Sequence, residues 1–229
     1  VGKFGITIAL GISILSVLCG CIGAKAPSLM VSQPVATGEY ETRKLRIYRD
    51  EMEIYGIAHI PSGISHGQKL PAVILSHELG ATLDRVKPYG EELAKAGYVT
   101  VCFDFCGGGH ASRSDGDLLE MSVLTEKADL EAVLAEVKGW EFVDTGSVYL
   151  MGNSQGGLVT ALTAAEHQDE VRAVILIYPA FSIYDDVHRM FDSPDEIPET
   201  HSLLGLRLGQ RYFRDIWPLE PYEVIQGYG

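Results

Sequence analysis

Hydrophobic and polar positions follow two distinct patterns between residues 42 and 180. Residues 42–48 and 52–60 alternate between apolar and polar side chains and are joined by three polar residues, which predicts an antiparallel hairpin. Continuous apolar runs come next, and such runs are typical of strands buried on both faces of a parallel sheet. The runs cover 71–77, 98–105, 146–152 and 171–180.

Helical spacing separates these apolar runs. The clearest helix is 121–139, in which apolar residues three and four positions apart form one stripe. The stripe comprises Val123, Leu124, Ala128, Leu130, Val133, Leu134 and Val137. Residues 85–97 and 155–167 predict two further helices. Because strands and helices alternate, the sequence predicts an α/β fold with a mainly parallel sheet and the hairpin at one edge.

Beyond Ala180 the regular pattern ends. Residues 181–229 are irregular, with one predicted helix near 202–212 and no further buried strand. Aromatic side chains are frequent here; they suit an aromatic or otherwise apolar ligand, and they suit a segment that packs on itself equally well. These aromatic residues are Phe181, Tyr184, Phe191, Tyr212, Phe213 and Trp217.

The N-terminus differs in composition from the rest of the chain. Lys3 is the only charged residue before Lys25, and the apolar stretch between them is typical of a secretory signal. Residues 18–21, Leu-Cys-Gly-Cys, resemble the cleavage box of bacterial lipoproteins, in which Cys21 becomes the lipidated first residue. The stretch also has about the ~20 residues that an uncleaved membrane anchor needs. A conventional cleaved signal is the third interpretation.

All three interpretations place the following domain outside the cytoplasm, either anchored at the cell envelope or secreted. Residues 1–23 are then the signal or membrane anchor, and residues 24–40 are a small, polar, proline-containing linker. Contact with a membrane is expected only through this N-terminal segment. The sequence favours no particular oligomeric state.

Composition narrows the possible functions. The chain has 46% hydrophobic residues and a formal net charge of −13. It has no basic run that would follow a phosphate backbone, so nucleic-acid binding is not expected.

Cys102 and Cys106 are four residues apart on a predicted strand, roughly 13 Å, which exceeds the ~7 Å limit between disulfide Cα atoms. We expect two buried thiols and no metal site, because no further ligands lie at suitable spacing.

The strongest chemical signal is the pentapeptide Gly152-Asn153-Ser154-Gln155-Gly156. A predicted strand runs directly into Ser154 and a predicted helix begins at once, which is the arrangement of a nucleophile elbow. The sharp turn would hold the Ser154 hydroxyl at the carboxyl edge of the sheet, beside a helix N-terminus that favours developing negative charge. Ser154 is therefore the candidate catalytic nucleophile.

Two backbone N–H groups are expected to stabilise the oxyanion that forms when such a serine attacks a carbonyl. One belongs to the residue after the nucleophile, Gln155, and the other to the loop after the third strand. That loop, Ser-His-Glu-Leu-Gly-Ala-Thr at 76–82, resembles a His-Gly-x-x-Gly pattern and makes Leu79 the second donor. Glu78 departs from the pattern, and three roles stay open for it: tilting the loop, contacting substrate or facing solvent.

Other polar residues near this site have different expected roles. We expect His77 to brace its loop by hydrogen bonding rather than to act as a base. Asp104 precedes the serine in the chain, so a structural role is expected. Residues 106–116 are rich in glycine but lack the ending and spacing of a phosphate-binding loop. We interpret them as a flexible loop that places His110 near the mouth of the site.

These residues together resemble the α/β-hydrolase superfamily, and more narrowly the bacterial cinnamoyl- or feruloyl-esterase-like and serine-aminopeptidase-like hydrolases. The resemblance rests on "VILSHELGA", "FDFCGGG" with "SDG", "MSVLTE", "YLMGNSQGG" and "YPA". It implies a hydrolase core at 41–180 and a cap at 181–229, inserted after the sixth strand. It also implies a serine hydrolase that cleaves small-molecule carboxylic esters and needs neither a metal nor an organic cofactor.

In that family the catalytic acid follows the seventh strand and the histidine follows the eighth. This sequence ends before both, so the resemblance implies a fragment of a longer protein, inactive and poorly folded on its own. Alternatively, Asp185 or Asp186 could complete a triad from the cap with His188 or His201. Two other functions stay open, an aminopeptidase-like amide hydrolase and a non-catalytic binding protein.

Overall fold

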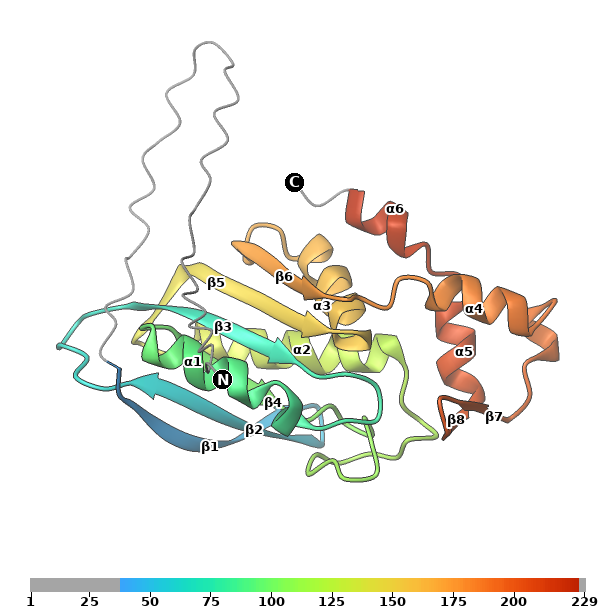
Figure 1. The fold of residues 1–229 in the computed structure, drawn as a ribbon, viewed down its shortest axis with the longest axis horizontal. Helices are drawn as coiled ribbons and strands as arrows, with labels where there is room; N and C mark the ends of the chain where they lie inside the picture. The colour runs from blue at the N-terminus through green and yellow to red at the C-terminus, as the bar shows by residue number, and fades with distance from the viewer. Residues whose placement is uncertain (1–37, 227–229) are drawn as a thin grey trace, which may run out of the picture. The chain divides into compact units, whose positions relative to one another are not determined.

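A six-stranded sheet forms the centre of the computed structural model, which describes residues 38–226 (Figure 1). The strand order is β1-β2-β4-β3-β5-β6. β1 pairs antiparallel with β2 and β2 with β4, whereas β3 pairs parallel with β4 and β5, and β5 with β6. In chain order, β1 to β6 span Tyr40–Arg49, Met52–Pro61, Leu70–Ser76, Val99–Phe103, Val143–Asn153 and Ala173–Ile177.

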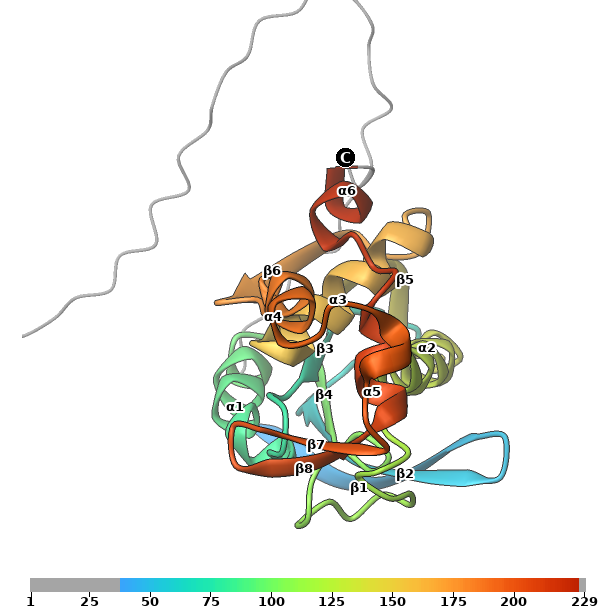
Figure 2. The ribbon, with the colours of Figure 1, turned by 90° about the vertical axis from the view of Figure 1, so that its right-hand side faces the viewer.

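Helices cover both faces of this sheet (Figure 2). α1 (Lys87–Lys95) lies on one face, preceded by a 3₁₀ turn at Leu83–Arg85. α2 (Val123–Lys138) and α3 (Gln155–Glu166) lie on the other. The predicted α/β fold with its N-terminal hairpin is therefore confirmed, because each strand and helix expected between residues 42 and 167 matches an observed element.

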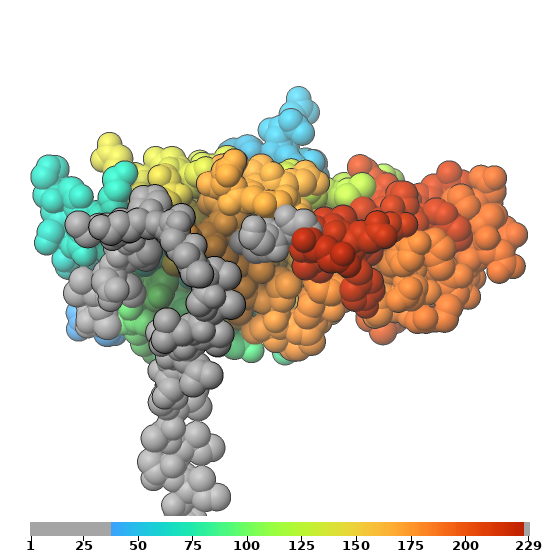
Figure 3. Space-filling model, turned by 90° about the horizontal axis from the view of Figure 1, so that it is seen from above, coloured from blue at the N-terminus to red at the C-terminus, as the bar shows by residue number. Residues whose placement is uncertain are grey.

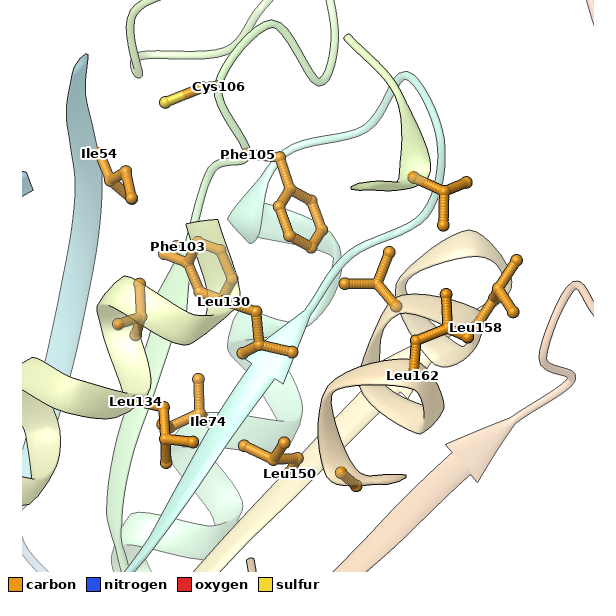
Figure 4. Packing of buried hydrophobic residues seen from close by; sticks show 14 of the residues in the cluster. Ile54, Ile74, Phe103, Phe105, Cys106, Leu130, Leu134, Leu150, Leu158 and Leu162 are labelled. Atoms are coloured by element: carbon orange, nitrogen blue, oxygen red, sulfur yellow. The ribbon is translucent and has the colours of Figure 1, made fainter. Parts of the chain in front are cut away.

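The apolar runs form the core, as their pattern predicts. All seven residues of β3 and all five of β4 are buried. Ile74 and Leu150 from neighbouring strands belong to one buried cluster with Leu130 of α2 and Leu158 of α3 (Figure 4). Burying each such side chain contributes about 1.5–3 kcal/mol. The packing holds the carboxyl ends of β3 and β5 side by side, and those ends carry the candidate site.

The apolar stripe predicted along α2 is wrong at Leu124, which is 38% exposed. Glu126 and Asp129 face the interior instead, and both are buried. Asp129 accepts hydrogen bonds from Arg49 Nε at 2.6 Å and from the Cys106 backbone N–H at 2.8 Å. A carboxylate with such partners can occupy a core position. A prediction that counts only apolar residues therefore leaves Asp129 off the buried face of α2.

Residues 181–226 lie beyond the carboxyl ends of β5 and β6 (Figure 1), and the atoms of this segment, orange to red, gather on one side of the surface (Figure 3). The helix predicted near 202–212 is wrong for most of its length, since a hairpin occupies 200–209. Leu204 and Gly205 both have positive φ, 50° and 82°, as a two-residue hairpin turn requires. The elements of this segment are α4 (Ile183–Met190), a 3₁₀ turn (Pro194–Glu196), β7 (Thr200–Leu203), β8 (Leu206–Gly209), α5 (Gln210–Ile216) and α6 (Pro221–Gln226).

β6 is the outer strand of the sheet within residues 38–226. β5 pairs with one of its edges, and no strand among these residues pairs with the other. All five residues of β6 are apolar, yet Ile175 is 43% exposed. An unpaired apolar edge is a template for pairing with a further strand.

The N-terminal predictions fall on residues that the structure does not describe. The signal or anchor at 1–23, the lipidation residue Cys21 and the linker up to residue 37 all lie outside the described range. Within residues 38–226, no helix has both the length and the apolar character needed to cross a bilayer.

Candidate active site

Ser154 lies at the sharp turn between β5 and α3. Its φ of 49° and ψ of −118° put it in the positive-φ region, which L-residues adopt only at a cost and only when their surroundings hold them there. Its N–H donates to the Ile177 carbonyl at 3.0 Å, and its own carbonyl accepts from Gly157 N–H and Ala180 N–H, both at 2.9 Å. The strained turn is thus fixed by hydrogen bonds from α3, from β6 and from Ala180, the last residue before segment 181–226.

The glycines beside Ser154 allow a close approach of helix and sheet. A Cβ on Gly156 would lie 2.6 Å from the Ser76 carbonyl oxygen of β3. A Cβ on Gly152 would lie 2.5 Å from the Gly156 carbonyl carbon. Both contacts involve backbone atoms that no rotamer change can move away. The glycine spacing that marks an elbow in the sequence therefore has a direct steric reason here.

The two predicted oxyanion donors share a cavity with the serine. Leu79, Ser154 and Gln155 line a cavity of about 130 Å³. Within residues 38–226, neither the Leu79 N–H nor the Gln155 N–H donates a hydrogen bond to the protein. Two free N–H groups at one cavity, one of them at a helix N-terminus, suit an oxyanion. The structure thus brings the three residues predicted from the sequence to one cavity.

His77 braces the loop that carries Leu79, as predicted. Its Nδ1 lies 2.8 Å from the Glu78 carbonyl oxygen, and its Nε2 accepts the Phe105 N–H at 3.1 Å. These partners require the proton on Nδ1 and occupy both ring nitrogens. Burial lowers the pKa of His77 and favours the neutral ring. His77 therefore has no free nitrogen with which to accept a proton from Ser154.

Asp104 also has the structural role that its place in the chain predicts. It is fully buried, and its Oδ1 accepts the Leu83 N–H at 2.7 Å. Its Oδ2 accepts from Arg113 Nε at 2.7 Å and from the Arg113 N–H at 3.0 Å. Asp104 thus joins the turn before α1 to the loop after β4.

Glu78, the residue that departs from the expected loop pattern, points toward β6. Its Oε1 accepts from the Tyr178 hydroxyl at 3.3 Å and lies 3.5 Å from an Arg85 nitrogen. Its Oε2 is buried and has no hydrogen-bond partner among the described residues. Tyr178 directly follows β6 and has a φ of 40°. Of the three roles left open, facing solvent is the one that this geometry excludes.

The later histidines are engaged with other groups. His167 contacts Glu170 and Glu131 at 2.9 and 3.0 Å. His188 Nδ1 lies 2.9 Å from the Tyr184 carbonyl oxygen, and the ring stacks on Trp217 at 4.1 Å. His201 packs edge-on against aromatic rings, with its centroid 5.5 Å from that of Phe213. Within residues 38–226, no histidine forms a hydrogen bond with Ser154.

The alternative triad from residues 185–201 is not assembled in this structure. Asp186 does line the Ser154 cavity, but its carboxylate pairs with Arg189. Neither Asp185 nor Asp186 contacts His188 or His201 through a hydrogen bond. His110, expected near the mouth of the site, lines a separate cavity of about 430 Å³ together with Arg207.

Sequence reasoning missed a buried polar chain behind the site. The Gln155 side chain donates to Glu126 Oε2 at 2.8 Å and accepts from the Tyr212 hydroxyl at 2.5 Å. Burial raises the pKa of Glu126 to about 8, which the hydrogen bond from Gln155 only partly opposes. The sequence does hold one signal for this chain: Glu126 falls between Val123 and Leu130 on the apolar face of α2, which indicates a buried carboxyl group.

Metal-dependent chemistry has no candidate site among the described residues, where no group of three or more His, Cys, Asp or Glu side chains is arranged to hold an ion. Cys102 and Cys106 are free and buried, as predicted. Burial raises the pKa of the Cys106 thiol to about 12 and that of Cys102 further, so both are protonated and unreactive at neutral pH.

Known proteins share this fold. A family model described as serine aminopeptidase, S33, matches residues 67–217. Est1E from Butyrivibrio proteoclasticus, solved with ferulic acid bound, is similar over 80% of this chain and 74% of its own, with 24% identity and a TM-score of 0.72. The α/β hydrolase GrgF from Penicillium sp. sh18 is similar over 83% and 77%, with 16% identity and a TM-score of 0.63.

A third similar structure is acetyl xylan esterase 1 from Thermoanaerobacterium sp. JW/SL YS485. It matches over 71% of this chain and 54% of its own, with 23% identity and a TM-score of 0.52. Curated protein sequences give no significant match. At such identities, the structural likenesses establish the α/β-hydrolase fold, and the family match covers the strands and loops that carry Ser154, Leu79 and Gln155.

Proposed function

Since the chain belongs to the serine aminopeptidase family S33 of the α/β-hydrolases, we propose that it carries the nucleophile of a carboxylic ester hydrolase, Ser154. One observation carries the proposal. Ser154 sits at positive φ on a strand-to-helix turn, and it shares a cavity with Leu79 and Gln155, whose backbone N–H groups have no partner among residues 38–226. A turn serving only as a connection would need neither the strained serine nor the free donors.

The reaction follows from this geometry. The Ser154 oxygen attacks the ester carbonyl carbon while a general base takes the hydroxyl proton. Negative charge develops on the carbonyl oxygen, and the Leu79 and Gln155 N–H groups donate to it. The tetrahedral adduct collapses, the alcohol leaves with the proton returned by the base, and an acyl-Ser154 remains. Water then attacks the acyl group, the base takes its proton, and the acid is released as Ser154 regains its hydrogen.

We place the general base and its acidic partner outside residues 38–226. Two observations support this placement. The described histidines form no hydrogen bond with Ser154, and no strand among the described residues pairs with the outer apolar edge of β6. Further strands beside β6 would cover that edge and bring loops to the carboxyl end of the sheet, where Ser154 lies. The proposal is tested by the gene downstream of residue 229: a stop codon directly after Gly229 would contradict it.

We favour esters over amides as substrates. Est1E was solved with ferulic acid and a second similar protein is named an acetyl xylan esterase, which supports small-molecule esters, whereas the family description supports aminopeptidase activity. The gene product that carries this chain should hydrolyse p-nitrophenyl esters and feruloyl esters but not aminoacyl-anilides. The opposite preference would make it an amide hydrolase, and turnover of neither would support the non-catalytic alternative.

Residues 181–226 act as a cap in this proposal. Asp186, Leu203 and Leu204 from this segment line the Ser154 cavity together with Leu79 of the core. The segment therefore supplies one wall of the substrate site. Residues 41–180 supply the nucleophile and both oxyanion donors.

The N-terminal segment is proposed to export the protein and to tether it at the cell envelope through lipidation of Cys21. The support is sequence alone, an apolar stretch that ends in Leu-Cys-Gly-Cys. Cells fed a clickable palmitate analogue should label the wild-type protein and the Cys19→Ser variant, but not Cys21→Ser. Labelling of Cys21→Ser would overturn the lipidation site.

A further inference from the structure

The side chain of Gln155 is held at both ends inside the protein. Its amide nitrogen donates to Glu126 Oε2 at 2.8 Å, and its amide oxygen accepts from the Tyr212 hydroxyl at 2.5 Å. All three side chains are buried, with at most 1% of each residue exposed. We call Glu126, Gln155 and Tyr212 the Gln155 network. It joins three separate segments: α2, the elbow and α5.

The network acts on the same residue whose backbone is proposed to bind the oxyanion. Gln155 is the first residue of α3 and follows the strained Ser154. The direction of its N–H depends on the peptide plane between these two residues, and the Ser154 carbonyl in that plane accepts from the Gly157 and Ala180 N–H groups. A side chain fixed by two buried hydrogen bonds restricts that plane further, because neither end of the amide can rotate without breaking a bond.

Helix α5 of the cap forms a second side-chain hydrogen bond, to the start of α2. Ser122 Oγ, at the N-cap of α2, donates to Asp215 Oδ2 at 2.6 Å. Tyr212 and Asp215 are three residues apart on α5 and thus on one helix face. Through these two bonds α5 contacts both the helix that carries Glu126 and the residue that follows the nucleophile.

On the proposed function, which this inference presupposes, we propose that Tyr212 of the cap and Glu126 of α2 are positioning residues for the oxyanion site. They hold the Gln155 side chain, and through it they keep the Gln155 N–H aimed at the developing oxyanion. The packing of the cap against the core therefore has a second effect besides lining the substrate cavity. Through α5 it fixes the orientation of one of the two oxyanion donors. The cap and the catalytic turn are coupled through a single amide.

Tyr212→Phe tests the cap half of this coupling, because it removes one hydroxyl and leaves the packing of the ring in place. Losing a complete oxyanion donor costs roughly 10²–10³ in kcat. We expect misalignment of one donor to lower kcat about tenfold, with KM within about twofold. Affinity for a phenylboronic acid, which forms a tetrahedral adduct with the serine, should fall in parallel with kcat. Tyr149→Phe, which removes a hydroxyl on β5 beside Tyr98, should leave both values unchanged.

The α2 half is tested by comparing two variants of Glu126. Glu126→Gln keeps an oxygen that accepts from Gln155 and should retain kcat at neutral pH, whereas Glu126→Leu removes the acceptor and should lose about as much as Tyr212→Phe. The double variant Glu126→Leu/Tyr212→Phe should lose no more than the larger single loss, because both act through Gln155. A merely structural network would give additive losses of thermal stability with kcat unchanged.

These measurements, made on the full gene product that carries this chain, separate failure of this inference from failure of the proposed function. If Ser154→Ala keeps esterase turnover, the function itself is wrong. If Ser154→Ala is inactive but Tyr212→Phe keeps wild-type kcat and boronate affinity, the function stands and the positioning role is overturned. Additive kcat losses in the double variant would likewise overturn coupling through Gln155.

Discussion

Asp104 and Arg113 form a partly buried ion pair at 2.7 Å that closes the loop after β4 onto the turn before α1. Asp104 is fully buried, and it also accepts the backbone N–H groups of Leu83 and Arg113. Its charge therefore serves the fold rather than Ser154. The turn before α1 directly follows the loop that carries Leu79, so the ion pair stabilises the fold close to the candidate active site.

Asp104→Asn should destabilise the protein by about 2–4 kcal/mol, because an amide nitrogen would face the Arg113 guanidinium and the charge-assisted bonds would be lost. Denaturant unfolding measures this loss. The folded fraction should still react with a fluorophosphonate probe at the wild-type rate. A variant of wild-type stability that no longer reacts would instead place Asp104 in the catalytic chemistry.

Ser154→Ala should lower ester turnover of the full gene product by at least about 10⁴-fold, since no other group would form the acyl-enzyme. Circular dichroism and the melting temperature should stay close to those of the wild type. Ser65→Ala, on the exposed loop after β2, is the matched control and should keep full turnover. Retained turnover in Ser154→Ala would rule out the nucleophile.

Gly156→Ala should cost about 3 kcal/mol or more, because the new Cβ would meet the Ser76 carbonyl at 2.6 Å and backbone cannot yield locally. Gly146→Ala is the matched change at an open position, where the nearest atom is a side-chain oxygen 3.6 Å away. That variant should melt within a few degrees of the wild type. Equal stability of the two variants would contradict the close approach of α3 and β3.

The raised pKa of Glu126, about 8 because of burial, makes stability depend on pH. An acid whose pKa is higher in the folded state than in the unfolded state binds more protons when folded, so stability falls as pH rises from about 4.5 to about 8. Above pH 8 the loss is complete, on the order of 5 kcal/mol. Glu126→Gln should therefore unfold at higher denaturant than the wild type at pH 8.5 and nearly the same at pH 4.5. An equal difference at both values would show that Glu126 does not titrate in this range.

Residues 38–226 produced alone should self-associate through the open edge of β6. Ile175→Lys, at the 43% exposed position, should reduce light scattering and shift sedimentation toward the monomer. Leu124→Lys makes the same change at a 38% exposed position on α2 and should leave association unchanged. A soluble monomer with a cooperative melt would contradict the expectation for the unmodified chain.

The core and the elbow could be predicted because their signals are local. Continuous apolar runs mark β3 and β4, and the glycines around Ser154 have a steric reason that holds in any fold with this turn. The β7–β8 hairpin could not be predicted in this way. Its strands have four residues each, too few for a period to emerge, and its turn places Leu204, a non-glycine residue, at positive φ.

The Gln155 network could not be predicted for a different reason. Its members lie on α2, the elbow and α5, so the chain brings them together only after folding. Glu126 alone gives a hint, because a charged residue interrupts an otherwise apolar face. Hydrophobic patterning assigns such a residue to solvent, and only the partners it meets across the fold make its burial tolerable.

The Ser154 carbonyl accepts hydrogen bonds from Gly157 on one side and from Ala180 on the other. The chain therefore leaves the sheet for the cap from a point anchored to the nucleophile itself. Segments of other length or sequence can follow Ala180 without displacing the serine, so the substrate wall can change while the reacting turn stays constant. Such exchanges have one condition: a hydroxyl or another donor must still reach Gln155 from the position that Tyr212 now fills.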